Sequence, residues 1–216
     1  VVWADKELFS GKPNFKHLMK EDYPVMTEEE KTWMTTKVEE ALSMVDEHKF
    51  WVDGDITPEV LDFVKKEKFF GLIIPKEYGG LGFSPIANSE MVMRLASRSL
   101  PLAITAMVPN SLGPAELLLH YGTKEQKEHW LPRLADGREV PCFALTEPNA
   151  GSDVGGMAST GVIFKDTDGT LKVRLNWNKR FITLASMATV LGMAFLTQDP
   201  DNLLGTGRVH LGITTA

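Results

Sequence analysis

Residues 143–153 have the residue types best suited to bind a ligand. A short apolar run that includes Phe143 and Leu145 leads into a turn that contains Thr146, Gly151 and Ser152. Glycine lets the backbone approach a ligand closely, and adjacent amides beside a hydroxyl can bind the polar edge of a flavin or a pyrophosphate. The same residue types also form ordinary surface turns. The chemistry of this segment alone leaves a ligand-binding turn and a plain turn both open.

The other reactive residue types favour structural roles. Cys142 lies in an apolar run, which predicts a buried thiol rather than a nucleophile. The five histidines are scattered without metal-ligand spacing, so we expect no metal site. Gly79, Gly80 and Gly82 resemble half of a dinucleotide-binding fingerprint, but no strand–helix–strand pattern surrounds them. They indicate a loop.

Composition limits the class of protein. The chain has 216 residues, of which 43% are hydrophobic and 24% charged, and its net charge of −6 disfavours nucleic acid as a partner. The single cysteine favours a reducing compartment, and we expect a cytoplasmic location. We find no apolar run that reaches the length of a bilayer span and no signal peptide. Because the sequence begins with Val1 rather than Met, a membrane anchor ahead of it, and association with an inner membrane, stay open.

Helical patterns dominate the first two thirds of the chain. Residues 1–26 have mixed polarity and predict an irregular lead-in. Residues 27–140 then predict a helical domain, with apolar side chains at helical spacing behind several helix-start signals. These signals are the capping boxes at Thr27 and Thr123, the Thr57-Pro58 and Ser84-Pro85 pairs, and a cap at Asn110.

Residues 141–216 predict strands instead. Residues 161–164 and 171–177 flank a turn with Gly169, which is typical of a hairpin. Val173, Leu175 and Trp177 alternate with polar residues and predict a half-buried strand, and residues 188–196 and 209–213 predict two more. The predicted class is therefore α+β, or two segregated domains, with a boundary near residue 140. We expect an all-helical bundle before it and the start of an antiparallel, barrel-like β-domain after it.

A family resemblance covers residues 27–216. The segment Ala144-Leu-Thr-Glu-Pro-Asn-Ala-Gly-Ser-Asp-Val-Gly-Gly156 resembles the signature of the acyl-CoA dehydrogenases. Asn176-Trp-Asn-Lys-Arg-Phe-Ile-Thr183 resembles the strand that holds the family's aromatic-Ile-Thr triplet, and residues 71–82 and 121–134 resemble further family segments. The details of residues 176–180 are most similar to the large bacterial fatty-acyl-CoA dehydrogenases of β-oxidation. Against the family's plan, the chain holds the N-terminal domain and part of the middle domain, without the C-terminal helical domain.

The resemblance implies a FAD site. Phe143, Leu145 and Thr146 would line the pyrimidine side of the flavin, and Gly151 and Ser152 would contact the pyrophosphate. Ser152 would also contact bound acyl-CoA. Phe181, Ile182 and Thr183 would form the second segment, with Phe181 packed on the flavin and Thr183 beside N5. Phenylalanine replaces the family's frequent tryptophan, which keeps the ring face but removes a donor. Glu147 and Asp153 are interpreted as turn-stabilising carboxylates rather than bases.

The resemblance also implies an activity and partners. The family removes two hydrogens from the α and β carbons of an acyl-CoA thioester, here expected to be a fatty acyl-CoA. The base is a glutamate of the C-terminal domain, so we assign no catalytic residue in this chain. An electron-transfer flavoprotein as acceptor and a homo-oligomer are expected. An acyl-CoA oxidase, a flavin monooxygenase of the same fold, and a non-catalytic acyl-CoA-binding relative stay open as alternatives. Acyl chain length is not fixed by the sequence.

Overall fold

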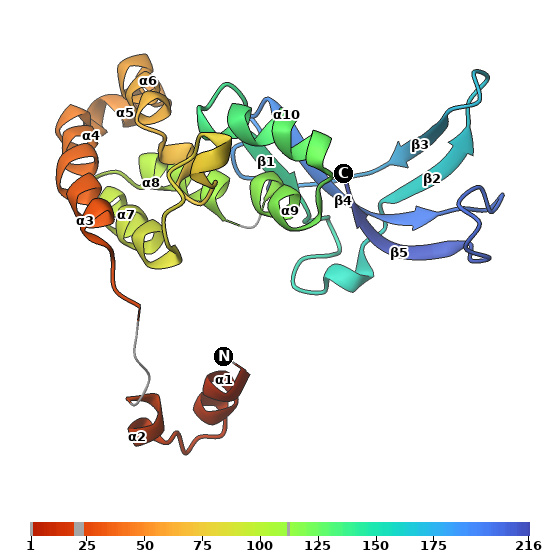
Figure 1. Ribbon diagram of the computed structural model, residues 1–216, viewed down its shortest axis with the longest axis horizontal. Coiled ribbons are helices and arrows are strands. Elements are labelled where there is room, and N and C mark those ends of the chain that lie inside the picture. The colour runs from red at the N-terminus through yellow and green to blue at the C-terminus, as the bar shows by residue number, and fades with distance from the viewer. Residues whose placement is uncertain (1, 20–23, 112) are drawn as a thin grey trace.

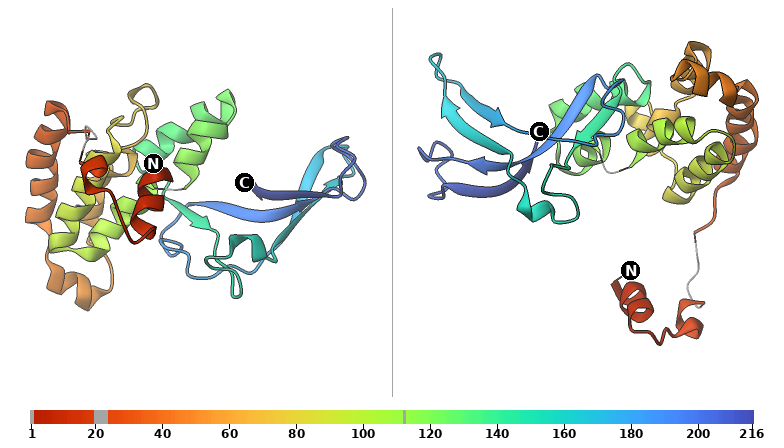
Figure 2. Two further views of the ribbon diagram at one scale, coloured as in Figure 1. Left: turned by 90° about the horizontal axis from the view of Figure 1, so that it is seen from below. Right: turned by 180° about the vertical axis from the view of Figure 1, so that it is seen from behind.

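The computed structural model describes residues 2–19, 24–111 and 113–216. From residue 24 onward it has a helical unit followed by a β-sheet unit (Figure 1). Both views of Figure 2 show the strands extending away from the helices on one side. The units meet where α10 (Lys124–Ala135) leads into β1 (Pro141–Ala144). The predicted α+β class is confirmed.

The helical unit contains short and medium helices joined by tight turns. A π-helical turn (Met34–Val38) joins α3 (Glu28–Trp33) to α4 (Glu39–Met44). Turns of 3-10 helix lie at Phe69–Gly71, Lys76–Tyr78 and Val108–Asn110. The helices between α4 and α10 are α5 (Glu47–Asp53), α6 (Pro58–Lys66), α7 (Pro85–Arg98), α8 (Leu100–Met107) and α9 (Pro114–Tyr121).

Local side-chain bonds begin several of these helices as the sequence predicts. Thr27 and Thr123 each form a complete capping box, the first with Glu30 and the second with Gln126. The Ser84 hydroxyl accepts the amide of Ala87 at the start of α7. Thr57 precedes α6 with Pro58 in its first turn, but its side chain makes no capping bond.

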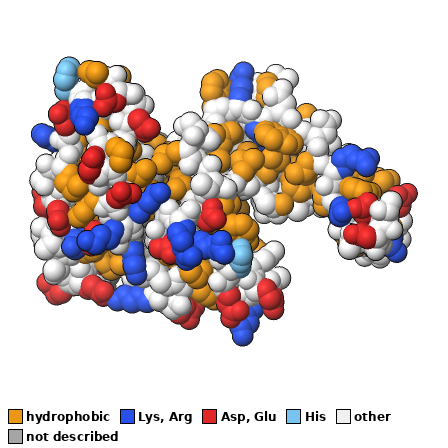
Figure 3. All heavy atoms as spheres, turned by 90° about the horizontal axis from the view of Figure 1, so that it is seen from above, with side chains coloured by type: hydrophobic (Ala, Val, Ile, Leu, Met, Phe, Trp, Pro, Cys, Tyr) orange, Lys and Arg blue, Asp and Glu red, His pale blue; other side chains and the backbone are white. Residues whose placement is uncertain are grey.

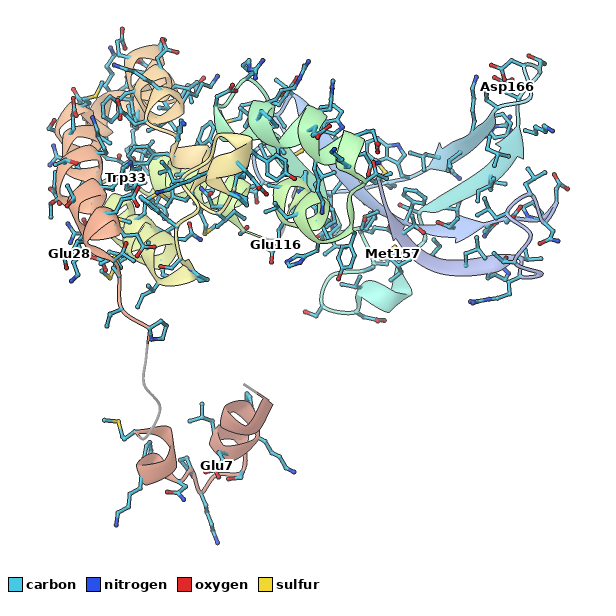
Figure 4. The ribbon with its side chains drawn as sticks, viewed as in Figure 1. Glu7, Glu28, Trp33, Glu116, Met157 and Asp166 are labelled. Carbon is cyan, nitrogen blue, oxygen red and sulfur yellow. The ribbon has the colours of Figure 1, made fainter. Side chains whose placement is uncertain are left out.

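The core of the helical unit is aromatic at its centre. Trp33, labelled in Figure 4, lies with its ring 4.6 Å from that of Phe69 and 5.7 Å from that of Phe83. Buried side chains of α4, α6, α7 and α8 surround these rings, among them Val64 and Met91. Burial of this apolar surface is what holds α3–α8 together.

Asn110 does not cap the following helix, contrary to the sequence prediction. Its side chain is buried and donates to the carbonyls of Phe69 and Ala106, while its Oδ1 accepts the amide of Ile73 at 3.3 Å. Helix α9 begins four residues later, after Gly113. The Asn110 side chain therefore bonds to buried backbone groups of a distant turn instead of capping the helix that follows it.

Two helices occupy the segment predicted to be irregular. α1 (Val2–Phe9) and α2 (Phe15–Leu18) lie away from the helical unit in Figure 1. The Gly11 and Pro13 signals fall in the connection between them rather than preventing helix formation.

Leu100–Tyr121, a segment of 22 residues, is long and apolar enough, by length and composition only, for a membrane span, with mean hydropathy 1.3 in an 18-residue window. This corrects the expectation that no such run exists. In the described residues it is divided into α8, the 3-10 turn and α9, which bury Leu102, Ala106 and Ala115 inside the protein. Core helices have this same composition.

The β-unit is one five-stranded sheet. After β1, its strands are β2 (Thr160–Lys165), β3 (Leu171–Asn176), β4 (Val190–Gln198) and β5 (His210–Thr215). Strands β2 and β3 form the predicted hairpin, with Gly169 at a positive φ in its turn. Strand β4 is central: it pairs with β1 along its first half and with β2 and β5 further on.

The sheet is mixed and open, so the prediction of an antiparallel, barrel-like domain is wrong in these two respects. β4 runs parallel to both β1 and β2, and antiparallel to β5. Parallel pairing needs a long connection, and the segments between these strands are long enough to return the chain to the same end of the sheet. The alternating apolar pattern of a strand contains no information about the direction of its partner.

Strand β3 also differs from the prediction. Val173, Leu175 and Trp177 are 46%, 40% and 48% exposed, although their alternation predicted a buried face. β3 is an edge strand paired with β2, which leaves these side chains exposed to solvent. Figure 3 shows hydrophobic side chains exposed over the β-unit.

Candidate functional site

The predicted ligand-binding turn follows β1 directly. Residues 145–153, called the ligand turn below, begin with a tight loop closed by two backbone bonds between Glu147 and Ala150, at 2.9 and 3.3 Å. Ala150 is buried against Met157, labelled in Figure 4, and against Ala194 of β4. Strand β4 therefore supports the turn from beneath.

Glu147 anchors the ligand turn from the inside. Its carboxylate is 5% exposed and accepts the amides of Ala158 at 2.6 Å and Ser159 at 3.1 Å and the Lys179 ammonium at 2.7 Å. Burial alone would raise the pKa of Glu147, but these hydrogen bonds outweigh it and lower the pKa to about 2. The carboxylate accepts three hydrogen bonds and is ionised, which agrees with its interpretation as a turn-stabilising group rather than a base.

The second predicted segment lies against the first. Lys179 donates to the Leu145 carbonyl at 3.0 Å, and the Arg180 amide donates to the Thr146 carbonyl at 3.0 Å. These bonds join parts of the chain that are 34 residues apart. The structure thus brings together the two groups of residues that the sequence assigned to one site.

Phe181, Ile182 and Thr183, called the triplet below, alternate in direction. Ile182 packs against buried Ala144, Met193 and Phe195 of the sheet. Phe181 is 79% exposed, with the Arg180 guanidinium 4.7 Å from the centre of its ring, and Thr183 is exposed as well. The two side chains predicted to face a flavin are therefore open to solvent, on either side of an anchored isoleucine.

The triplet does not lie in a strand, which corrects the prediction. β3 ends at Asn176, and the chain from there to β4 has no strand pairing. Phe181 has φ 57° and Leu184 has φ 64°, both in the left-handed region that non-glycine residues seldom adopt. Contacts with other parts of the chain hold this segment, because within the described structure it has no hydrogen bonds to a neighbouring strand.

The ligand turn contains hydrogen-bond donors that have no partner among the described residues. Within the described chain, the Thr146 and Ser152 hydroxyls and the amides of Gly151 and Ser152 make no protein hydrogen bond. Gly151 and Ser152 are exposed, and nothing lies within 4 Å of the place where a Gly151 side chain would begin. Donors of this kind suit an anionic pyrophosphate, and a hydroxyl next to them suits a flavin edge. The residues present fit FAD.

Phe143 packs against Ala150, Met157 and Ala194, which support the ligand turn. Its ring packs against Gly192 and Pro114 and lines a cavity of about 480 Å³ between α9, α10 and β4, together with Trp130 and Leu191. Leu145 is half-buried, with its side chain in the cluster that includes Ala150 and Met157. The structure therefore brings Thr146, Gly151, Ser152 and the triplet together, with Phe143 and Leu145 packed in one cluster against the ligand turn.

Lys179 was missed by the sequence analysis. Its side chain is 0% exposed, although its residue type predicts a solvated position. The sequence shows only that this lysine lies two residues before Phe181, which does not by itself indicate burial.

The chain matches two family models. The model for the acyl-CoA dehydrogenase N-terminal domain matches residues 26–138, and the model for the middle domain matches residues 142–211. The chain belongs to the acyl-CoA dehydrogenase family. Between the two models lies the boundary between helices and sheet.

Individual relatives agree with this assignment. The chain is 38% identical over 159 residues to the rat mitochondrial very long-chain specific acyl-CoA dehydrogenase, covering 74% of this chain and 23% of that protein. It is 40% identical over 134 residues to the caffeyl-CoA reductase-Etf complex subunit CarC of Acetobacterium woodii, covering 62% of this chain and 34% of that protein.

Solved structures share the fold. An acyl-CoA dehydrogenase from Bacillus anthracis in complex with FAD aligns with a TM-score of 0.63 and 26% identity, over 79% of this chain and 30% of that one. The chain therefore spans about a third or less of these relatives, as the coverage of 23–34% shows.

Proposed function

We propose that the protein to which this chain belongs binds FAD and dehydrogenates fatty acyl-CoA to trans-2-enoyl-CoA in β-oxidation. The observation that carries the proposal is the joining of the ligand turn to the triplet through Lys179 and Arg180. The relatives support the reaction class, since one is named a very long-chain acyl-CoA dehydrogenase. The FAD complex among the related structures supports the cofactor.

Five residues of the site have a defined task in this proposal. The amides of Gly151 and Ser152, with the Ser152 hydroxyl, bind the pyrophosphate, and Ser152 also contacts the acyl-CoA. Thr146 donates to the pyrimidine edge of the flavin. Phe181 would cover one face of the flavin ring, and the Thr183 hydroxyl would contact the flavin near N5. When bound, FAD accepts the hydride that leaves the β-carbon.

The proton from the α-carbon needs a base that this chain's site does not provide. Glu147 is buried and accepts three hydrogen bonds that lower its pKa to about 2, which makes it a weak base. We propose that the base is a glutamate in the C-terminal domain of the family's plan. Holding base, carbonyl and flavin together is what makes the weakly acidic α-proton removable.

A second candidate is reduction of an enoyl-CoA, the reverse direction. It is favoured by the 40% identity to a subunit of a caffeyl-CoA reductase-Etf complex. That relative's name also supports an electron-transfer flavoprotein as the redox partner here. We further propose a homo-oligomer in the cytoplasm or at the inner membrane; gel filtration and cell fractionation of the full-length protein test these two points.

The proposed function is tested on purified full-length protein. We expect a yellow flavoprotein whose absorbance near 450 nm falls when palmitoyl-CoA is added without oxygen. Oxygen consumption with substrate would favour an oxidase or monooxygenase, and oxidation of reduced flavin by an enoyl-CoA without the forward reaction would favour the reductase. A colourless protein that binds acyl-CoA would favour the non-catalytic alternative.

A further inference from the structure

Lys179 occupies an unusual position for a lysine. Its side chain is 0% exposed and makes two bonds, to the Leu145 carbonyl at 3.0 Å and to the Glu147 carboxylate at 2.7 Å. Moving an ammonium and a carboxylate out of water is costly, and an apolar pair of similar size often gives an equally stable protein. Stability alone therefore gives a weak account of this pair, whereas a fixed geometry gives a better one.

The two acceptors of Lys179 lie on either side of Thr146. The carbonyl belongs to the residue before Thr146 and the carboxylate to the residue after it. The next residue after Lys179, Arg180, donates its amide to the Thr146 carbonyl itself. Three consecutive residues of the ligand turn are thus tied to two consecutive residues of the other segment, which fixes Thr146 relative to the triplet.

The segment that holds the triplet needs these ties. It has no strand pairing, and Phe181 and Leu184 adopt positive φ angles that a free chain would seldom keep. On the far side of the triplet, Leu184 and Met187 pack against the helical core. On the near side, the anchoring groups are Lys179 and the Arg180 amide. Loss of the lysine would leave that end held by one backbone bond.

We propose that Lys179 is a positioning residue for the flavin: through Leu145 and Glu147 it sets the separation between Thr146 and the triplet. This proposal rests on the proposed function, since it assigns both segments to one FAD. In this proposal Lys179 contacts neither the flavin nor the substrate. It acts by positioning Thr146 and the triplet, which contact the flavin. A lysine that served only the stability of the fold would not affect the bound flavin selectively.

The test uses full-length Lys179→Met, with Lys66→Met as the matched control, because Lys66 is exposed at the end of α6 and makes no ion pair in the described structure. Apoprotein is titrated with FAD by calorimetry, and the visible spectrum of the bound flavin is recorded. We expect at least about tenfold weaker FAD binding and a shifted flavin spectrum for Lys179→Met, with neither change for Lys66→Met.

A double-mutant cycle with Glu147→Gln tests the route. If Lys179 acts through Glu147, its loss costs less affinity in the Glu147→Gln background than in the wild type. The double variant Lys179→Met, Glu147→Gln leaves no unpaired buried charge. If Lys179→Met alone does not fold, the FAD affinity and spectrum of the double variant are measured in its place. Wild-type FAD affinity and spectrum in either Lys179 variant would overturn the inference while the proposed function stands. Wild-type protein that binds no FAD would overturn both.

Discussion

Glu30 and Ser84 lie 54 residues apart and are joined directly, because the Ser84 amide donates to the Glu30 carboxylate at 2.6 Å. The other oxygen of Glu30 accepts the Thr27 amide at 2.7 Å. One buried carboxylate therefore accepts the backbone amides of the residues that cap two helices, α3 and α7. Burial alone would raise the pKa of Glu30, but the bonds from Ser84 and Thr27 hold it below its usual value.

The first prediction concerns this carboxylate. Glu30→Gln keeps the shape but turns an amide group toward a backbone donor, which should destabilise the protein by about 1–3 kcal/mol. Glu29→Gln is the control, since Glu29 pairs with Lys76 in solvent and should change stability by less than about 1 kcal/mol. Urea unfolding of the full-length protein measures both. Equal small effects would contradict the role given to Glu30.

The second prediction separates two neighbouring glycines of the loop after α6. A side chain at Gly80 would begin 2.0 Å from the Ile74 carbonyl oxygen, whereas one at Gly79 would meet nothing within 4 Å. Gly79 instead has φ 84°. Gly79→Ala should cost about 1 kcal/mol through backbone strain, and Gly80→Ala clearly more, about 3 kcal/mol, because backbone must move. Thermal unfolding tests this order, and the reverse order would contradict it.

Local features of the fold could be predicted from the sequence, and contacts between distant segments could not. The capping boxes at Thr27 and Thr123 depend on residues three positions apart, so the pattern is complete within the sequence. The direction of β4 relative to β1, by contrast, depends on how a long connection returns. Asn110 was assigned to a local cap because its partners, among them Phe69, lie far away in the chain.

The candidate site shows the same division. Thr146, Ser152 and Thr183 could be assigned through the family resemblance, and the structure brings their segments together. Lys179 could not, because a lysine in a polar stretch predicts a solvated side chain and its burial follows only from the neighbouring turn.

The third prediction follows from the pKa of Glu147, which is about 2 in the folded protein and 4.5 in the reference state. A lowered folded pKa gives stability that is present above pH 4.5 and is lost as the pH falls toward 2. Wild type should therefore exceed Glu147→Gln in stability at neutral pH, with about 3 kcal/mol as the order of the ionisation term. The gap should shrink between neutral pH and pH 3, in urea midpoints measured at both. A stability difference that does not change with pH would contradict the conclusion that ionised Glu147 stabilises the ligand turn.

The fourth prediction tests Thr146 as a flavin ligand. Thr146→Val in the full-length protein keeps the shape and removes the hydroxyl, leaving a flavin polar atom unpaired at a cost of about 1–3 kcal/mol. FAD should bind about 5–150-fold more weakly, or flavin reduction should slow. Thr167→Val, in the exposed hairpin turn, is the control. Unchanged flavin content and reduction rate would argue against Thr146.

The fifth prediction concerns residues 1–216 produced alone. Phe181 is 79% exposed and Thr183 and Ser152 are exposed, so a flavin held by the ligand turn and the triplet would have one side covered. Each Å² of ring left in water forgoes roughly 25 cal/mol of binding. Glu147 is a poor base for the α-proton, because three hydrogen bonds keep its carboxylate ionised and lower its pKa to about 2.

We therefore expect weak FAD binding and no dehydrogenation from residues 1–216, in contrast to the full-length protein measured beside them. Far-UV circular dichroism first establishes that the shorter chain is folded. Calorimetric titration with FAD, followed by palmitoyl-CoA and an artificial electron acceptor, then compares the two proteins. Sub-micromolar binding together with substrate-dependent reduction of the acceptor by the shorter chain would show that its own residues supply the base and both walls of the site.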